Sequence, residues 1–363
     1  MKIARVEAVP LSIPFTYGGG AVRHGVGAWR TLDFCLVRVE TDTGAVGWGE
    51  AFSYSCRRAV AAAVNDMVAP RAVGHDVADI AGLHAKLQRD LHIFGRYGIT
   101  VFAISGLDIA LWDLAGKTAG APLHRLLGGA KRTTVPCYAS LLRYTEPKLV
   151  AEHCRRALDE GYDAIKLHEV EDDAVAAARA AVPRPIPLMV DVNCEWTPEG
   201  AIAAAQRLRP HDLEWLEEPV FPPEDFRSLR AVGEASGVPI AAGENFCFTT
   251  QFAALFDARA VTFAQPSVTK VGGITEFRKV AALADARGVR VAPHSPYFGP
   301  GALATLHLLA ASGDARFEHF YLQAEGKLFG AALDPAGGAL AVPGGPGLGA
   351  DPDPGVIRRF RAD

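Results

Sequence analysis

The sequence has few of the features that mark specialised classes of protein. Its 363 residues contain no Cys-x-x-Cys pair, no Gly-x-Gly-x-x-Gly fingerprint after a predicted strand and no unbroken apolar run of membrane-spanning length. The formal net charge is only −4, so the chain has no basic excess for nucleic acid or for an acidic membrane surface. These absences argue against a dinucleotide-binding fold, a membrane protein and a nucleic-acid-binding protein.

The amino terminus and the cysteines indicate a reducing compartment. The first residues, Met-Lys-Ile-Ala-Arg-Val-Glu-Ala-Val, have a glutamate where a secretory signal needs its apolar centre. Six scattered cysteines suggest no disulfide framework, and a chain of this size needs none for stability. We therefore predict a cytoplasmic protein with reduced cysteines. Cys194 and Cys247 each follow a candidate metal ligand by three residues, so a thiolate zinc site is an alternative.

The first 125 residues change from a strand pattern to a helical pattern. Strands are predicted at residues 1–13, 31–40 and 45–50, with a hairpin turn at 41–44. Residues 100–117 carry apolar side chains at helical spacing. Residues 1–125 are therefore predicted to form an α+β domain. The glycine-rich stretch 15–30 is too long for a tight turn, and loops of this kind often cover an active site.

From residue 134 onward, strand-like and helix-like segments alternate. Strands are predicted at residues 135–139, 164–168, 187–191, 213–217, 239–243, 261–265, 290–293 and 316–319. They lack polar alternation, as expected for parallel strands buried on both faces. We predict a TIM-type barrel over residues 126–323; an open doubly wound sheet is the alternative, weakened by the missing glycine fingerprint. The glycine- and proline-rich residues 324–363 are predicted to pack back on the amino-terminal domain.

Three carboxylates stand at an even spacing at the ends of consecutive predicted strands. Asp191, Glu217 and Glu244 are separated by 26 and 27 residues, about one βα unit each. Because the carboxyl ends of barrel strands meet at one mouth, these side chains should converge. Three carboxylates cannot all stay charged and unpaired, and a hard divalent cation is the natural counter-charge. The spacing therefore predicts a metal site.

Polar residues also occupy the matching ends of the other predicted strands: Lys166, His168, Asn193, Ser267, His294 and Glu318. Each alone is as easily a loop residue, but so regular a set is hard to obtain by chance. A metal held by three carboxylates can bind a substrate carboxylate and stabilise the enediolate formed when its α-proton is removed. Lys166 and His168 precede the metal strands and His294 follows them, so they should approach the substrate from opposite sides. Glu318 is interpreted either as a protonated donor to the substrate carboxylate or as a structural acid.

The sequence resembles the enolase superfamily, specifically its mandelate racemase/muconate-lactonising group, over nearly the whole chain. The resemblance rests on Ala103-x-x-Gly106-x-Asp108-x-Ala110-Leu111-Trp112-Asp113-x-x-Gly116-Lys117, Pro122-Leu123-x-x-Leu126-Leu127-Gly128-Gly129, Asp191-Val192-Asn193, Trp215-Leu216-Glu217-Glu218-Pro219, Gly243-Glu244-Asn245 and Lys270-Val271-Gly272-Gly273-Ile274-Thr275. It implies a modified (β/α)7β barrel with an α+β capping domain. It also implies one Mg²⁺ ion on Asp191, Glu217 and Glu244, a small carboxylate substrate, and a homo-oligomer ranging from dimer to octamer.

Two departures from the family pattern bear on the reaction. The second-strand motif Lys-x-Lys of the family is Lys166-Leu167-His168 here, so the resemblance makes His168 the base, with Lys166 near the substrate carboxylate. Ser267 stands where one branch has an aspartate beside His294 and another has a catalytic lysine. A serine can orient an imidazole but supplies no charge for imidazolium. We therefore expect His294 to be a weak base that serves as a neutral hydrogen-bond donor or, when protonated, as an acid.

The family's specificity comes from its capping domain. The resemblance therefore suggests substrate-binding residues there, namely Tyr17, Arg23, His24, Tyr54, Arg96 and Tyr97. Asn193 and Ser267 are the substrate-binding candidates on the barrel.

The pattern favours a lyase that dehydrates a sugar acid to a 2-keto-3-deoxy acid. His168 would take the α-proton and His294 would protonate the departing β-hydroxyl, and the basic residues Arg23, His24 and Arg30 suit a polyhydroxy acid. One alternative is a racemase, epimerase or cycloisomerase, although the missing aspartate argues against a two-base racemase. The other is a metal-binding homologue that has lost catalysis.

Overall fold

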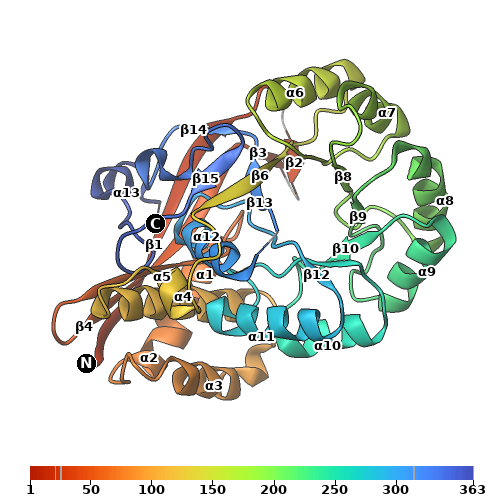
Figure 1. Cartoon of the computed structure of the whole chain (residues 1–363). Helices are drawn as coiled ribbons and strands as arrows, with labels where there is room; N and C mark the ends of the chain where they lie inside the picture. Colours follow the sequence, from red (N-terminus) through yellow and green to blue (C-terminus); the bar gives the residue numbers. More distant parts are fainter. Residues whose placement is uncertain (21, 25–26, 314, 363) are drawn as a thin grey trace.

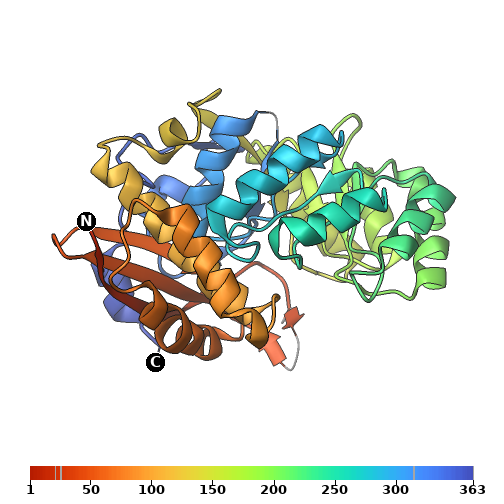
Figure 2. The ribbon, with the colours of Figure 1, turned by 90° about the horizontal axis from the view of Figure 1, so that it is seen from below.

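The computed structural model describes residues 1–20, 22–24, 27–313 and 315–362, and the side chains of these residues except 22–24, 27 and 28. The chain forms a cap built on an antiparallel sheet and a barrel-like parallel sheet ringed by helices (Figure 1). Both termini lie on the cap side of the molecule, as the view from below also shows (Figure 2).

Among the described residues, the cap sheet has four strands in the order β14-β1-β4-β5. Their bounds are Gln323–Ala324, Ile3–Thr16, Thr31–Thr41 and Val46–Ala51. The predicted hairpin of the last two strands is confirmed, since Glu40 pairs with Val46 across the turn. The stretch predicted as a long loop contains a small separate hairpin, β2 (Val22–His24) and β3 (Gly27–Trp29).

The cap helices pack on the sheet and against the barrel. They are α1 (Arg57–Ala62), a π-helical turn (Ala63–Val68), α2 (Ala69–Ala72), α3 (Ile80–Asp90), a 3₁₀ turn (His92–Phe94) and α4 (Ile99–Thr118). α4 contacts both β5 and the barrel helix α11 (Gly273–Ala286). It approaches β5 so closely that a Cβ on Gly49 would lie 1.9 Å from the carbonyl oxygen of Gly106. A Cβ on Gly106 would in turn lie 2.6 Å from Val37 Cγ2 and 3.0 Å from the backbone nitrogen of Ala51, which gives a physical reason for the glycine in the Ala103-x-x-Gly106 motif.

Asp108 and Asp113 interrupt the apolar residues of α4, so it is not an unbroken apolar run, but it has the length of a membrane span. By length and composition alone this helix could cross a bilayer, with a mean hydropathy of 1.5 over its most apolar window. However, 78% of that window is buried inside the protein. Its apolarity follows from its position, because a helix enclosed between a sheet and a barrel has no face for solvent.

The fold class predicted from the sequence is confirmed: within the described part of the chain, eight parallel strands form a curled sheet. They are β6 (Thr134–Ser140), β7 (Ile165–Leu167), β8 (Leu188–Asp191), β9 (Trp215–Glu217), β10 (Ile240–Ala242), β11 (Phe263–Ala264), β12 (Arg290–Val291) and β13 (Phe317–Phe320). β6 to β12 pair in sequence order, and β13 returns to pair with β6. This order excludes a doubly wound sheet, in which the strand order reverses near the middle.

Helices cover the outside of the barrel; the first precedes β6, and each of the others follows a strand. They are α5 (Leu123–Leu126), α6 (Pro147–Asp159), α7 (Asp172–Ala181), α8 (Pro198–Leu208) with a 3₁₀ turn (Arg209–His211), α9 (Phe226–Ser236), α10 (Phe248–Asp257), α11 and α12 (Pro300–Ser312). Thr197 caps α8 and Asp225 caps α9 by accepting backbone hydrogen bonds. Alanine-rich inner faces let these helices pack close to the strands.

The last residues contact both the cap and the barrel. β14 pairs with β1, and α13 (Pro354–Phe360) also packs on β1. Between them lie a 3₁₀ turn (Gly330–Leu333) and β15 (Ala339–Ala341), which pairs antiparallel with β6. The carboxyl-terminal segment therefore links the two parts of the molecule.

Candidate active site

The three predicted metal ligands come together at the carboxyl mouth of the barrel. Asp191 and Glu217 are register partners at the ends of β8 and β9, and Glu244 follows β10 by two residues. One carboxylate oxygen from each lies within 4.8 Å of those of the other two. Oxygens bound to one octahedral Mg²⁺ are about 3 Å apart when adjacent and about 4.2 Å when opposite, since each sits about 2.1 Å from the ion. The donor set and its spacing therefore fit a magnesium ion.

Lys166 lies inside this cluster and is completely buried. Its Nζ is 3.1 Å from Asp191 Oδ2, 2.9 Å from Glu217 Oε1 and 2.7 Å from Glu318 Oε1. Burial alone would lower the pKa of this lysine, but the three carboxylates raise it well above its ordinary value. Lys166 is therefore a fixed positive charge in the structure, which suits it to hold an anionic group and not to act as a base.

The cluster carries an excess of negative charge. Four carboxylates face two lysines, because Lys270 Nζ also lies 3.4 Å from Glu244 Oε1, so −4 and +2 leave a formal charge of −2 when all four carboxylates are ionised and the histidines are neutral. Burial, and then the charge of Asp191, raise the pKa of Glu217 well above its ordinary value. Asp191 has a lowered pKa because Lys166 and His168 outweigh its burial. A divalent cation would balance the remaining −2.

His168 lies at the edge of the cluster next to Asp191. Its Nε2 is 3.3 Å from Asp191 Oδ2, and its Nδ1 is 2.7 Å from the carbonyl oxygen of Leu141. A carbonyl oxygen can only accept, so Nδ1 carries a hydrogen. Once the contact with Asp191 is released, neutral His168 with this hydrogen on Nδ1 has its lone pair on Nε2, which is the arrangement of a base. The carbonyl of Leu141 and the carboxylate of Asp191 both accept hydrogen bonds. They therefore stabilise the imidazolium that forms when His168 takes a proton.

His294 lies on the other side of the cluster and has a different environment. Its Nε2 is 3.0 Å from Glu244 Oε2. Its Nδ1 is 3.3 Å from Ser267 Oγ, as the strand-end alignment predicts, and 3.1 Å from the hydroxyl of Tyr297. His294 and Lys270 lower the pKa of Glu244 although its burial opposes this. The two imidazoles thus flank the carboxylates, with a carbonyl behind one and hydroxyls behind the other.

Glu318 is held as an ionised acid. Oε1 accepts a hydrogen bond from Ser140 Oγ at 2.9 Å, and Oε2 accepts one from the backbone N–H of Ser295 at 3.1 Å. Its burial is outweighed by Lys166, which lowers its pKa. These contacts support the structural role predicted as one of two alternatives, because a carboxylate with occupied oxygens does not donate to a substrate.

The candidates for substrate binding are dispersed. Tyr54 donates its hydroxyl to the carbonyl of Pro296 at 2.6 Å, so it supports the loop that follows His294. Asn193 is exposed beside Asp191 and donates its backbone N–H to Asp191 Oδ1. Ser267, as noted above, contacts His294. The side chains of Arg23 and His24 lie outside the described residues, so their predicted roles stay predictions.

The remaining cap candidates make contacts that do not include the carboxylate cluster. Arg96 lies over the ring of Phe248, and Tyr97 is 59% exposed. Tyr17 packs against Tyr144, which follows β6. The capping loop therefore meets the barrel mouth near β6, but these three side chains carry no contact that assigns them to a site.

Some residues of the site were missed by sequence reasoning. Tyr297 was missed because its only signal is its position three residues after His294, in a loop whose path the sequence does not reveal. Lys270 was noted only as part of a motif, yet it contacts Glu244 and the ring of Phe52. Glu218 is buried with a pKa raised to about 8, first by burial and then by Glu244.

The cysteines give no support to the thiolate zinc alternative. All six are free, and Cys194 donates its thiol to Glu218 Oε2 at 3.3 Å. The thiol of Cys247 contacts the carbonyl oxygen of Lys270. In the part of the chain that the structure describes, the cluster able to hold a metal contains carboxylates alone.

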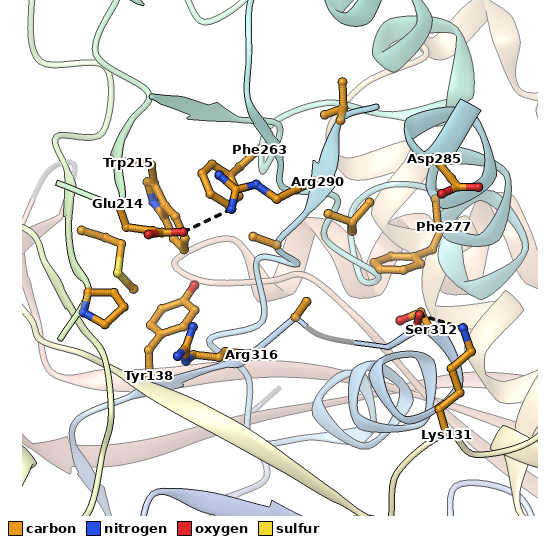
Figure 3. Close-up of a pocket in the computed structure, with 17 residues that line it drawn as sticks. Lys131, Tyr138, Glu214, Trp215, Phe263, Phe277, Asp285, Arg290, Ser312 and Arg316 are labelled. Carbon is orange, nitrogen blue, oxygen red and sulfur yellow. Dashed lines mark hydrogen bonds and ion pairs between the residues drawn. The ribbon is translucent and has the colours of Figure 1, made fainter. Parts of the chain in front are cut away.

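A hollow lies at the opposite, amino-terminal end of the barrel (Figure 3). It has a volume of about 640 Å³, and its inner wall includes the rings of Tyr138, Trp215 and Phe263. Its basic residues are engaged, because Arg290 pairs with Glu214, Lys131 bonds to Ser312 and Arg316 pairs with Asp163. The aromatic layer separates this hollow from the mouth, since Trp215 Nε1 donates to Glu217 Oε2 at 2.8 Å.

The fold and the mouth together define a capped barrel with a three-carboxylate candidate metal site. Residues 19–128 match the family described as "Mandelate racemase / muconate lactonizing enzyme, N-terminal domain", and residues 149–356 match "Enolase C-terminal domain-like". The chain belongs to the mandelate racemase/muconate lactonizing enzyme family of the enolase superfamily.

The similar proteins act on acid sugars or hold magnesium. A 3,6-anhydro-alpha-L-galactonate cycloisomerase from Streptomyces coelicolor is 37% identical over 78% of this chain and 79% of its own. An arabinonate dehydratase from Saccharolobus solfataricus is 31% identical over 92% of both chains. The crystal structure of a racemase from Streptomyces coelicolor A3(2) with bound magnesium has a TM-score of 0.87 and 31% identity, covering 99% of this chain and 100% of that one. The chain is an enolase-superfamily acid-sugar enzyme whose relatives are dehydratases and cycloisomerases.

Proposed function

We propose that this enzyme removes the α-proton of an acid sugar and expels the oxygen substituent on the neighbouring carbon. With a hydroxyl as the leaving group, the reaction is dehydration to a 2-keto-3-deoxy acid. The observation that carries the proposal is the pair of unlike imidazoles on opposite sides of the carboxylate cluster, His168 beside Asp191 and His294 beside Glu244. A substrate carboxylate placed at the cluster would have one imidazole on each side.

His168 is the base in this proposal. Its Nδ1 hydrogen is held by the carbonyl of Leu141, which leaves Nε2 free to take a proton once the contact with Asp191 is released. The electron pair of the broken C–H bond moves into the substrate carboxylate, forming an enediolate. Lys166 provides a fixed positive charge beside that carboxylate. A magnesium ion on the three carboxylates would add Lewis-acid stabilisation of the same charge when bound.

His294 assists the leaving group from the opposite side. The bond from the β-carbon to oxygen breaks as the electrons return from the enediolate, and the departing oxygen needs a proton. Protonated His294 donates from Nε2 and is left as the neutral imidazole, and the resulting enol then tautomerises to the 2-keto acid. The absence of a carboxylate behind His294 in the described contacts argues against reversible two-base racemisation, since hydroxyls do not compensate the charge of imidazolium.

Cycloisomerisation is the second candidate, favoured by the 37% identity to an anhydro-galactonate cycloisomerase. In a sugar acid with a 3,6-anhydro bridge, the oxygen on the β-carbon belongs to a ring. Its expulsion opens the ring and loses no water. The same residues would serve in the same roles, so the two candidates differ in the leaving group that the cap admits.

Proton NMR in deuterated water distinguishes these outcomes. The full-length protein with Mg²⁺ is incubated with aldonates, aldarates and 3,6-anhydro-aldonates, and product masses are recorded in parallel. A 2-keto-3-deoxy acid with loss of water indicates dehydration, and an isomer of unchanged mass indicates cycloisomerisation. Inversion at the α-carbon alone, or no exchange with any acid, would contradict the proposal.

A further inference from the structure

The predicted base His168 is held from behind by the loop between β6 and α6, residues 141–146. The carbonyl oxygen of Leu141 lies 2.7 Å from His168 Nδ1. Arg143 donates its Nε hydrogen to the carbonyl oxygen of His168 at 2.6 Å. The loop thus contacts both the ring and the backbone of His168, so the orientation of the imidazole depends on the conformation of the loop.

A buried carboxyl group fixes that conformation. Glu169, which is 2% exposed, accepts the backbone N–H of Tyr144 at 2.6 Å and that of Thr145 at 3.1 Å. Thr145 has a φ of 65°, in the left-handed region that β-branched residues rarely adopt. A residue keeps such a conformation only where its surroundings hold it, and here the hydrogen bonds to Glu169 do so.

The same loop contacts the cap through Tyr144. Its hydroxyl donates to the carbonyl oxygen of Tyr17 at 3.0 Å, and the two rings lie 5.4 Å apart. The Tyr144 ring is also stacked on His153 of α6, with centroids 4.1 Å apart. A Cβ on Gly18 would lie 2.7 Å from His153 Cε1, so a glycine at this position lets the cap approach the stacked pair. The loop is therefore joined to the predicted base on one side and to the cap on the other.

We propose that residues 141–146 position His168 and couple its position to the docking of the cap, with Glu169 and Tyr144 as the positioning residues. In the described structure, the hydrogen bonds of these two side chains end on backbone groups of the loop and of Tyr17, and not on the carboxylate cluster. A change at either residue therefore reaches the reaction through His168. The catalytic consequence rests on the proposed function, in which His168 takes the α-proton.

The structural part can be tested without a substrate. Hydrogen–deuterium exchange of the full-length protein with Mg²⁺ is followed by mass spectrometry on peptides that cover residues 141–146. Glu169→Ala should speed exchange of the Tyr144 and Thr145 amides at least about 10-fold, because both lose their acceptor. Glu169→Gln should have a smaller effect, since its amide oxygen can still accept a bond. Unchanged protection of the loop in both variants would overturn the inference.

Kinetics test the catalytic part. With an acid that the enzyme converts, Glu169→Gln should lower kcat about 10- to 100-fold, because displacing a reacting group by about 1 Å can cost a factor of about 100. Tyr144→Phe keeps the ring and loses only the hydroxyl, so kcat should fall about 3- to 10-fold, as expected for one neutral hydrogen bond. KM and the magnesium affinity should change little, because the loop holds the base and not the metal ligands. A loss of magnesium affinity as large as the loss of kcat would contradict the positioning role.

The double variant tests the coupling. If Glu169 and Tyr144 act through the same loop, Glu169→Gln combined with Tyr144→Phe should lower kcat by less than the product of the two single losses. A loss equal to that product would show that the two residues act independently and would contradict the coupling.

Matched controls are available elsewhere in the barrel. Glu276 is a buried glutamate that accepts the backbone N–H of Thr249 at 3.0 Å, and the hydroxyl of Tyr162 lies 2.9 Å from His319 Nδ1. Glu276→Gln and Tyr162→Phe therefore remove comparable contacts away from the loop. Both should keep the wild-type kcat and the wild-type exchange of residues 141–146. Losses in the controls as large as those in the loop variants would contradict the assignment.

Failure of the inference and failure of the proposed function give different results. If the wild type converts no acid, the proposed function fails, whereas hydrogen exchange still decides whether Glu169 holds the loop. If the wild type is active and both Glu169→Gln and Tyr144→Phe keep its kcat, the positioning role fails and the proposed function stands. These two conservative variants keep the result decisive if Glu169→Ala does not fold.

Discussion

The two ends of the barrel are lined by different chemistry although the same strands build both. At the carboxyl mouth, buried carboxylates outnumber lysines and keep an excess charge of −2. At the amino end, aromatic rings fill the interior and the basic side chains are engaged with protein groups at the rim.

The difference shows that uncompensated buried charge marks the functional end. Burying a charged group without a partner opposes folding, and a structure keeps such an arrangement where a ligand completes it. Arg290 and Glu214 at the other end are 61% and 35% exposed, so their pairing adds little stability. Substitutions at the mouth should therefore change binding and chemistry, whereas substitutions at the base should change neither.

The largest effect is expected from Glu217→Gln at the mouth. Removing one of three anionic ligands should lower magnesium affinity at least about 100-fold and activity about 1,000-fold, because the ion stabilises the enediolate by several kcal/mol. Calorimetric titration with Mg²⁺ and the exchange assay measure the two effects. The control is Glu214→Gln, three residues earlier at the base, which should leave both unchanged. Equal losses in the two variants would remove the distinction between the ends.

A smaller effect is expected when the predicted base is replaced. His168→Asn should slow exchange of the substrate α-hydrogen with deuterated water about 100- to 1,000-fold, the usual contribution of a general base, while magnesium binding persists. His92→Asn, at an exposed histidine in the cap, is the matched control and should behave as wild type. Full exchange in His168→Asn would remove this residue from the mechanism.

A buried carboxyl of the cap, Glu50 on β5, should make stability depend on pH. Burial raises the pKa of Glu50 to about 7, although its Oε2 accepts a hydrogen bond from Gly301 N–H at the start of α12. The folded state then binds more protons than the unfolded state above the ordinary glutamate pKa. Stability from this group is present at low pH and falls as pH rises to about 7, by on the order of 3 kcal/mol.

The variant Glu50→Gln isolates that dependence. Its free energy of unfolding, measured by denaturant titration at pH 5 and pH 8, should fall less over this range than that of the wild type. The exposed Glu152→Gln on α6 serves as the control and should keep the wild-type slope. A slope unchanged in Glu50→Gln would show that this carboxyl is not protonated in the folded protein.

The smallest effect is expected at the base of the barrel. Arg290→Met removes an exposed ion pair with Glu214 and a stacking contact with Phe263 at 3.9 Å. We expect a loss of stability of at most about 1 kcal/mol, and no change in activity. Thermal unfolding together with the exchange assay tests this. A loss of activity would show that the amino end also contributes to function, which would contradict the comparison of the two ends.

Much of the fold was predictable because it depends on short-range patterns. The apolar strands and alanine-rich helices of the barrel repeat along the chain, and their order alone excludes most other topologies. The local pattern could not show whether α4 is a core helix or a membrane helix, since the two have the same composition. Its contacts with β5 and α11 decide which it is.

The site was predictable to the extent that its residues occupy strand ends. The positions of Asp191, Glu217, Glu244, His168 and His294 follow from the repeat, because parallel strands bring their carboxyl ends together. Tyr297 could not be predicted, since it reaches His294 through the conformation of a loop. Tyr54 was predicted to bind substrate, and this stays a prediction; its hydroxyl is bonded to the carbonyl of Pro296 in that loop.

The sequence by itself determined the family, the barrel and the three carboxylates, because these depend on residue type and on spacing along the chain. Only the tertiary structure decided how the two histidines differ. The atoms behind each ring differ: the carbonyl oxygen of Leu141 lies behind His168, and the hydroxyls of Ser267 and Tyr297 lie behind His294. Such contacts join distant segments or follow the path of a loop, and no local pattern encodes them.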